Sequence, residues 1–205
     1  MKGLNRIKLV RHIHSLIERL RNIIKAHDPE AINIVLYSLY ANVKTLSEEI
    51  LCQETPSYEK EKIIRIINND CLEVTRLLTM ILRNVRPINL YTLIDLIGEL
   101  YKSGCIGIVD ATHKNIIRAL NKNPDGLAHF ADMLMDCGCV DLAIPVLLRL
   151  LRYGYNVPIV LMNLSIATYM LGEPREALKF AMMYRRITGK RMALEKPLRI
   201  VLGEI

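Results

Sequence analysis

Tryptophan is absent from this chain and glutamine occurs once, at Gln53, whereas lysine and arginine together contribute 28 residues. A shortage of glutamine beside many charged side chains is a trait of thermophile proteins. No apolar run reaches the roughly 18 to 20 residues that a membrane-spanning helix needs. No uninterrupted apolar stretch follows the N-terminus either, so we expect no secretory signal and a cytoplasmic location.

Sequence patterns of catalysis and nucleotide binding are also missing. The chain has no nucleophile elbow, no phosphate-cradling glycine loop and no dinucleotide fingerprint. Its five histidines are scattered, and His12 and His14, two positions apart on a helix, diverge instead of sharing a metal. We therefore expect neither an enzyme nor a bound cofactor.

The five cysteines lack the spacing of a zinc or redox motif. Cys137 and Cys139 are the only close pair, and a single residue separates them. An odd number of cysteines without a secretory signal is typical of reduced thiols. If Cys71, Cys105 and Cys139 occupy equivalent turns, stacked helices separate them by about 10 Å, too far for a disulfide or a shared metal. The sequence thus predicts separate thiols and no metal site.

Apolar residues recur every three or four positions along most of the chain, which predicts amphipathic helices. Two long stripes, at residues 4–26 and 29–50, predict an N-terminal pair of long helices. Shorter helices are expected at about 56–68, 71–84, 90–102, 106–121, 124–136, 140–153, 157–171, 174–187 and 191–202. No segment alternates long enough to predict a strand, so the expected fold class is all-α.

Glycine recurs every 34 residues, at Gly104, Gly138 and Gly172, and Cys71, Cys105 and Cys139 keep the same step. A period of 34 is the length of one helix–turn–helix unit in tetratricopeptide-type arrays. We expect turns at Asn68–Asp70, Ser103–Gly104, Cys137–Gly138 and Gly172–Glu173.

Residues 161–180 resemble a tetratricopeptide repeat: Leu161 and Leu164 are large, Ser165 and Ala177 are small, and Gly172 forms the turn. Small residues let the two helices of a hairpin touch. The preceding unit matches through Leu127, Phe130, Ala131, Gly138 and Ala143, so the resemblance is best over residues 124–188. The unit before that keeps Leu93, Leu96 and Gly104 but has Ile97 and Val109 where small residues are expected.

The resemblance implies antiparallel hairpins stacked as a right-handed α-solenoid. We divide the chain into an N-terminal amphipathic helical hairpin (residues 1–54), tetratricopeptide-like repeats (55–188) and a C-terminal capping helix (189–205). The first helix of each repeat would line a concave groove. The groove residues that the family pattern implies are Tyr91, Ile94, Tyr101, Lys102, Asp125, Ala128, Asp132, Met135, Asp136, Ile159, Met162, Ile166, Tyr169 and Met170.

This groove is acidic in its middle and apolar at its C-terminal end, and it lacks the basic-and-Asn clamp that some tetratricopeptide domains use for a carboxylate. We expect a non-catalytic interaction scaffold that binds a protein segment carrying Lys or Arg beside Leu, Ile or Phe. Two alternatives stay open for the Met and Tyr residues. They could be ordinary core, or the C-terminal helix could cover them.

The net charge of +7 is concentrated at the two ends of the chain. Residues 157–205 carry eight basic and four acidic side chains. The first 26 residues carry one acid, Glu18, and seven bases that could contact a polyanion: Lys2, Arg6, Lys8, Arg11, Arg19, Arg21 and Lys25. The alternative function is therefore a nucleic-acid or ribonucleoprotein-associated factor, while the plainer interpretation is a solvated helix face. The same basic and apolar helix could also enter the groove of a second copy, as a homodimer.

Overall fold

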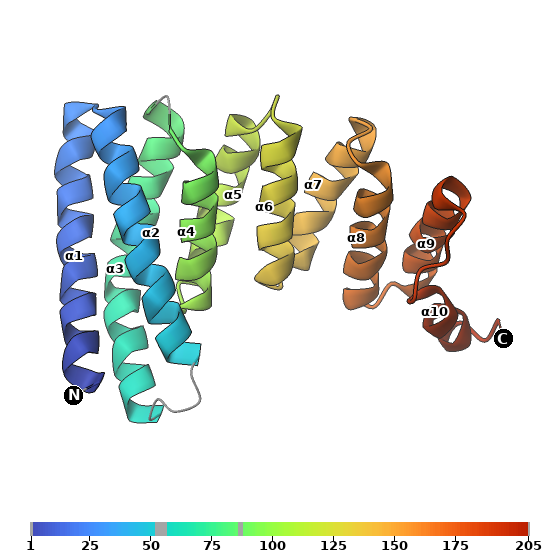
Figure 1. Cartoon of the computed structure of the whole chain (residues 1–205), viewed down its shortest axis with the longest axis horizontal. Coiled ribbons are helices and arrows are strands. Elements are labelled where there is room, and N and C mark those ends of the chain that lie inside the picture. Colours follow the sequence, from blue (N-terminus) through green and yellow to red (C-terminus); the bar gives the residue numbers. More distant parts are fainter. Residues whose placement is uncertain (1, 52–56, 86–87, 205) are drawn as a thin grey trace. The chain divides into compact units, whose positions relative to one another are not determined.

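The computed structural model describes residues 2–51, 57–85 and 88–204. These residues form helices and short connections, with no strand among them, which confirms the all-α class (Figure 1). The chain divides into two compact units, Met1–Ala119 and Leu120–Ile205. Among the described residues, every helix is too short or too polar to cross a membrane. The division predicted at residues 54 and 188 stays a prediction.

The first unit contains the long helices α1 (Lys2–Ala26), α2 (Pro29–Leu51) and α3 (Ser57–Asn84), followed by α4 (Leu90–Lys102) and α5 (Gly107–Ala119). Helix α1 packs against α2 and α3, α2 packs against α4, and α5 packs against α3 and α4. Figure 1 shows the three long helices side by side. Their apolar stripes meet in a core that includes Leu16, Leu20, Leu36, Leu39, Leu78 and Ile81.

Polar side chains cap the first turns of helices in both units. Asp28 Oδ1 accepts hydrogen bonds from the backbone N–H groups of Glu30 and Ala31, both at 3.1 Å, at the start of α2. Asn89 caps α4 and Asn123 caps α6 (Pro124–Asp136) in the same way. Such caps satisfy backbone donors that the first helical turn leaves free.

The turn predicted at Asn68–Asp70 is wrong, because α3 continues through it without a break. Polar residues at three positions lower helix propensity by only a few tenths of a kcal/mol each. The apolar stripe that follows, including Val74 and Leu77, stays buried and keeps the helix in place. Asp70 does not cap a new helix. Its Oδ2 lies 3.3 Å from His14 Nδ1 on α1.

The second unit contains α6, α7 (Val140–Arg152), α8 (Val157–Met170), α9 (Pro174–Thr188) and α10 (Glu195–Val201). Each helix packs against the next one along the chain. The connections between α6, α7, α8 and α9 are only three or four residues long. The last helix is shorter than expected and begins at Glu195, so that Pro197 falls in its first turn, where the missing N–H costs nothing.

Three of the four predicted turns are confirmed. Gly104, Gly138 and Gly172 have φ values of 107°, 72° and 78°, a left-handed conformation that other residues adopt at a cost. The predicted close contact inside the last repeat is confirmed too. Ser165 and Ala177 are both fully buried, and a hydrogen bond joins them.

Candidate functional site

Helix α8 has no charged residue, and its polar residues are Asn163, Ser165 and Thr168. One side of it packs into unit 2 through buried residues that include Leu161 and Leu164. The opposite side leaves Tyr169 41% exposed and Met170 55% exposed. A helix that is apolar all round is normally buried all round. The uncovered side of α8 is therefore unusual for a surface helix.

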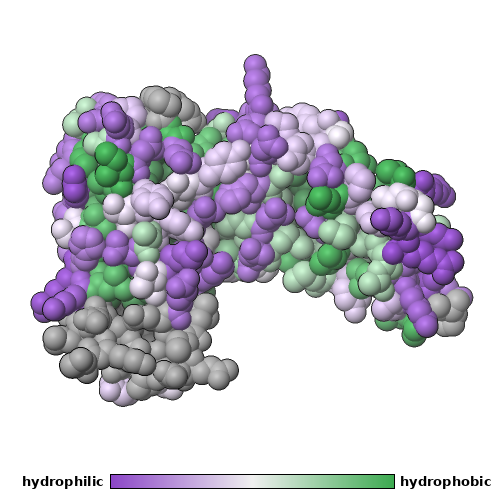
Figure 2. All heavy atoms as spheres, viewed as in Figure 1, coloured by the Kyte–Doolittle hydropathy of each residue, from purple (hydrophilic) through white to green (hydrophobic). Residues whose placement is uncertain are grey.

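The uncovered residues of α8 lie at positions i, i+3, i+7, i+10 and i+11, so they share one face of the helix. They are Ile159, Met162, Ile166, Tyr169 and Met170, of which Met162 is half-buried and the others are exposed. Figure 2 shows apolar atoms, coloured green, reaching the surface over the helices of this unit. Purple, hydrophilic residues gather over the C-terminal helices α9 and α10.

Helix α6 places three acids, Asp125, Asp132 and Asp136, on its corresponding face. Asn163 Nδ2 of α8 donates a hydrogen bond to Asp132 Oδ1 at 3.4 Å, and Tyr155 Oη donates one to Asp125 Oδ1 at 2.6 Å. These bonds hold Asp125 and Asp132 of α6 close to α8 and to the residues that precede it. We call this surface the α6–α8 face; its members are Asp125, Asp132, Asp136, Ile159, Met162, Ile166, Tyr169 and Met170.

The surroundings of Asp132 shift its pKa. Partial burial raises its pKa above the ordinary value, and the neighbouring Asp136 carboxylate raises that pKa further, while His129 opposes both effects. The protein thus holds a carboxylate at Asp132 where the charged form is disfavoured. A positive group placed against the α6–α8 face would favour the charged form of Asp132.

The remaining candidate groove residues belong to α4 in unit 1. Tyr91 is exposed and Tyr101 is half-buried. Lys102 is exposed, and its Nζ lies 3.2 Å from Glu99 Oε1. Ile94 is fully buried in the core, so its assignment to the groove is wrong. The α6–α8 face, which lies wholly within unit 2, is built without these residues.

The basic residues of α1 divide into two kinds. Lys8, Arg11, Arg19 and Lys25 are exposed. Arg21 instead binds Glu18 Oε2 through Nη1 and Glu73 Oε1 through Nε, each at 2.9 Å, and the hydrogen bond to Glu73 raises the pKa of Arg21. Arg21 therefore ties α1 to α3. The side chains of Lys2 and Arg6 lie outside the described residues.

The expectation that Cys71 and Cys105 are separate thiols is wrong, because they form a disulfide with their Cα atoms 5.7 Å apart. The expectation assumed that both lie in equivalent stacked turns. Cys71 instead lies within the continuous helix α3, which passes beside the α4–α5 turn that carries Cys105. Cys137 and Cys139 are both half-buried. Within the part of the chain that the structure describes, no three His, Cys, Asp or Glu side chains are grouped to hold a metal.

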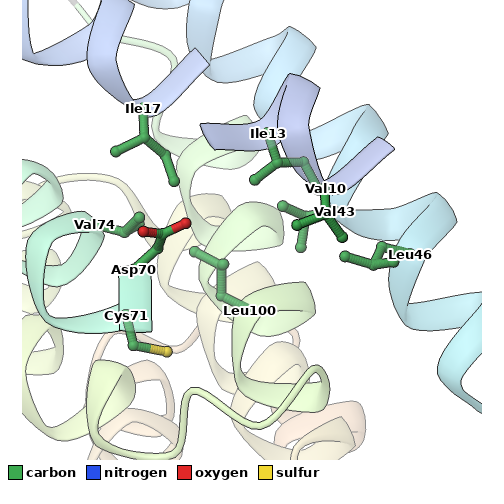
Figure 3. Close-up of a pocket in the computed structure, with 9 residues that line it drawn as sticks. All are labelled: Val10, Ile13, Ile17, Val43, Leu46, Asp70, Cys71, Val74 and Leu100. Carbon is green, nitrogen blue, oxygen red and sulfur yellow. The ribbon is translucent and has the colours of Figure 1, made fainter. Parts of the chain in front are cut away.

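Two hollows border this disulfide in unit 1. One is a small cavity of about 20 Å³ with an almost entirely apolar lining, into which Asp70 and Cys71 of α3 also face (Figure 3). Its other lining residues are Val10, Ile13, Ile17, Val43, Leu46, Val74 and Leu100. The other is a more open groove of about 410 Å³ beside the α4–α5 turn.

Sequence reasoning missed one buried charge, Glu195 at the start of α10. It is 4% exposed, and its Oε1 lies 3.3 Å from Arg185 Nη1 and 3.5 Å from Arg199 Nε. Its Oε2 is buried without a hydrogen-bond partner among the described residues. The i,i+4 spacing of Glu195 and Arg199 was the available signal, but only the packing of α10 on α9 buries the pair.

No protein-family model matches the chain, and neither a curated protein nor a solved structure matches it.

Proposed function

We propose that this chain is a non-catalytic interaction scaffold whose α6–α8 face binds a short segment of a protein partner. The main support for this proposal is the uncovered apolar side of α8, a helix without a single charged residue. Each square ångström of apolar surface that a partner covers contributes about 25 cal/mol. Contiguous exposed apolar surface on a folded protein is characteristic of an interaction site.

The acids of α6 indicate the chemistry of the partner. A segment with Leu, Ile or Phe would cover the apolar residues of α8, and an adjacent Lys or Arg would meet Asp132 and Asp136. The positive charge would also stabilise the ionised form of Asp132, which partial burial disfavours in the free protein. Met162 and Met170 add adaptable side chains that fit more than one apolar sequence.

In this proposal the hairpins stack as a right-handed, tetratricopeptide-like solenoid. The 34-residue step and the buried Ser165–Ala177 contact support that arrangement. On one continuous helix a step of 34 residues falls about 160° past a whole number of turns, so equivalent residues of α6 and α8 share a direction only if each repeat forms a separate hairpin.

A homodimer through the N-terminal helices remains a narrower version of the proposal. The apolar stripe of α1, including Ile13, Leu16 and Leu20, is buried in unit 1. Such a dimer must therefore use the outer, basic face of α1 or unpack the helix. A partner segment from another protein meets no such obstacle.

The proposal places the scaffold in the cytoplasm. The Cys71–Cys105 disulfide argues against that location, because stable disulfides are rare there outside hyperthermophiles. A composition poor in glutamine and rich in charge is what a thermophile source would explain.

Peptide binding tests the proposal directly. An array of peptides that combine Lys or Arg with Leu, Ile or Phe is probed with the parent chain and with the Tyr169→Ala and Asp132→Lys variants. We expect the first variant to lose affinity through lost area and the second through charge reversal. Met183→Ala, at an exposed position of α9, serves as the matched control and should bind as the parent does. Equal binding by all four proteins would place the working surface elsewhere.

A second candidate function, nucleic-acid binding, is supported by the exposed cations of α1. At 100° per residue, Lys8, Arg11 and Arg19 lie within about 80° of one another, on the side away from the buried stripe. Arg21, which is tied to Glu73, does not belong to this face. Binding of duplex or single-stranded nucleic acid that weakens steeply as salt rises would favour this candidate.

A further inference from the structure

The two cysteines of the Cys71–Cys105 disulfide differ in their exposure to solvent. Cys105 lies in the α4–α5 turn and is 3% exposed. Cys71 lies within α3 and is half-buried. Of the two residues, Cys71 is therefore the more accessible to a thiol that approaches from solvent. Access is one of the factors that decide which sulfur of a disulfide is attacked.

The open groove supplies the approach to Cys71. Its volume of about 410 Å³ falls within the range of small-molecule sites. Two apolar side chains border it, Leu72 at 82% exposed and Ile106 at 68% exposed. A Cβ added to Gly107 would meet no atom within 4 Å, so the backbone there faces open space. The remaining lining residues are Cys71, Thr75, Gly104, Cys105, Ile108 and Ala111.

The two sulfurs also differ as leaving groups. Cys105 stands two residues before α5, and its carbonyl accepts a 3.2 Å hydrogen bond from the backbone N–H of Ile108 in the first helical turn. A thiolate at a helix N-terminus is stabilised by the free amides and the positive end of the helix dipole. Cys71 instead lies inside the continuous helix α3, away from its N-terminus, where no free helix amides stabilise a thiolate. The exposed Asp110 in the first turn of α5 weakens the effect at Cys105.

We propose that Cys71–Cys105 is an exchange-active disulfide that accepts a low-molecular-weight thiol at Cys71 from this groove. The thiolate RS⁻ attacks Cys71 Sγ, a new RS–Sγ bond forms, and the Cys71–Cys105 bond breaks. The electron pair of that bond stays on Cys105 Sγ as a thiolate, which then takes a proton from water. A second thiolate attacks the bound RS sulfur, which releases RSSR and leaves Cys71 as a thiolate that is protonated in turn. Two RSH molecules thus supply the two electrons.

The exchange has a structural consequence in unit 1. The disulfide is the covalent link between α3 and the α4–α5 turn. Once Cys71 carries the small thiol, that link is lost while the added group occupies the groove beside Leu72 and Ile106. The site is independent of the α6–α8 face, which lies in unit 2.

The experiment uses the full chain with Cys52, Cys137 and Cys139 replaced by serine, so that only the disulfide pair remains. The folded protein is mixed with reduced glutathione, quenched with acid at early times, alkylated with N-ethylmaleimide and mapped by peptide mass spectrometry. We expect glutathione on Cys71 and the maleimide on Cys105, at least about tenfold over the reverse pattern. An excess of glutathione on Cys105, or an equal distribution, would overturn the proposal. Exchange that occurs only at the rate of global unfolding would also overturn it, since the disulfide would then be an inert staple.

Two further variants of this background test the role of the groove. Thr75→Trp narrows the groove and should slow the first exchange step at Cys71 about tenfold. Met183→Trp, on α9 in unit 2, adds the same bulk elsewhere and should leave the rate unchanged. Circular dichroism establishes that each variant is folded before its rate is measured. If a folded Thr75→Trp variant exchanges as fast as its background, the groove is not the route to the disulfide.

Discussion

Ser165 Oγ donates a hydrogen bond of 2.9 Å to the backbone carbonyl of Ala177, and both residues are fully buried between α8 and α9. The bond joins the two helices of one hairpin through two small residues. The sequence predicts this contact between Ser165 and Ala177, because two helices can approach closely only where both carry small residues. Their contact makes the α8–α9 pairing sensitive to volume at either position.

Ala177→Leu should destabilise the chain by about 1 to 3 kcal/mol, because three added carbon atoms have no space between α8 and α9. Urea unfolding followed by circular dichroism measures the change. Met183→Leu, on the exposed side of α9, alters a side chain of similar size and should change stability by less than about 0.5 kcal/mol. Unchanged stability in Ala177→Leu would mean that the two helices do not pack as closely as described.

Cys105→Ser should lower stability by about 2 to 4 kcal/mol through loss of the cross-link, which closes a loop between residues 34 apart. Dithiothreitol added to the parent chain should lower its thermal midpoint as much as the Cys105→Ser substitution does. It should have no effect on Cys105→Ser. Cys137→Ser removes a cysteine outside the Cys71–Cys105 disulfide and serves as the control. A parent midpoint that does not respond to reductant would contradict the prediction.

Asp132→Asn should raise thermal stability near pH 7, and the gain should disappear in acid. The folded protein raises the pKa of Asp132 above its unfolded value, mainly through partial burial. Between those two pKa values the folded state binds more protons than the unfolded state, so stability falls as pH rises through the window. Asparagine avoids this loss and keeps an oxygen to accept the hydrogen bond from Asn163.

The pH dependence of this gain is measured as the difference in thermal midpoint between variant and parent from pH 3 to pH 8. Asp141→Asn, at an exposed position of α7, removes the same charge and controls for net charge. At pH 3 residue 132 is uncharged in both the parent and the variant. A stability gain for Asp132→Asn that stays constant down to pH 3 would therefore contradict the raised pKa of Asp132.

Arg19→Gln and Arg21→Gln remove the same charge from α1 and should have opposite consequences. Arg21 holds Glu73 of α3 at 2.9 Å, so its loss should lower stability slightly, as for other partly exposed ion pairs. Arg19 is exposed on the outer face and should contribute little to stability. If α1 contacts a polyanion, Arg19→Gln should weaken low-salt binding more than Arg21→Gln does. Equal loss of binding would assign the effect to net charge alone.

The sequence by itself determined the features that depend on neighbouring residues. Asp28, Asn89 and Asn123 cap helices, and Gly138 and Gly172 form turns, because each acts on backbone atoms within a few positions. The 34-residue step likewise predicts that the aspartates of α6 and the apolar residues of α8 lie on corresponding helix faces.

Only the tertiary structure decided which distant residues meet. Helix α3 stays continuous through Asp70 because its apolar stripe is buried on its neighbours, a stabilisation that outweighs the weak local preference for a turn. That continuity places Cys71 beside Cys105, and the packing of α1 on α3 gives Arg21 its partner Glu73. These pairs are 34 and 52 residues apart, and no local pattern encodes the register in which two packed helices align.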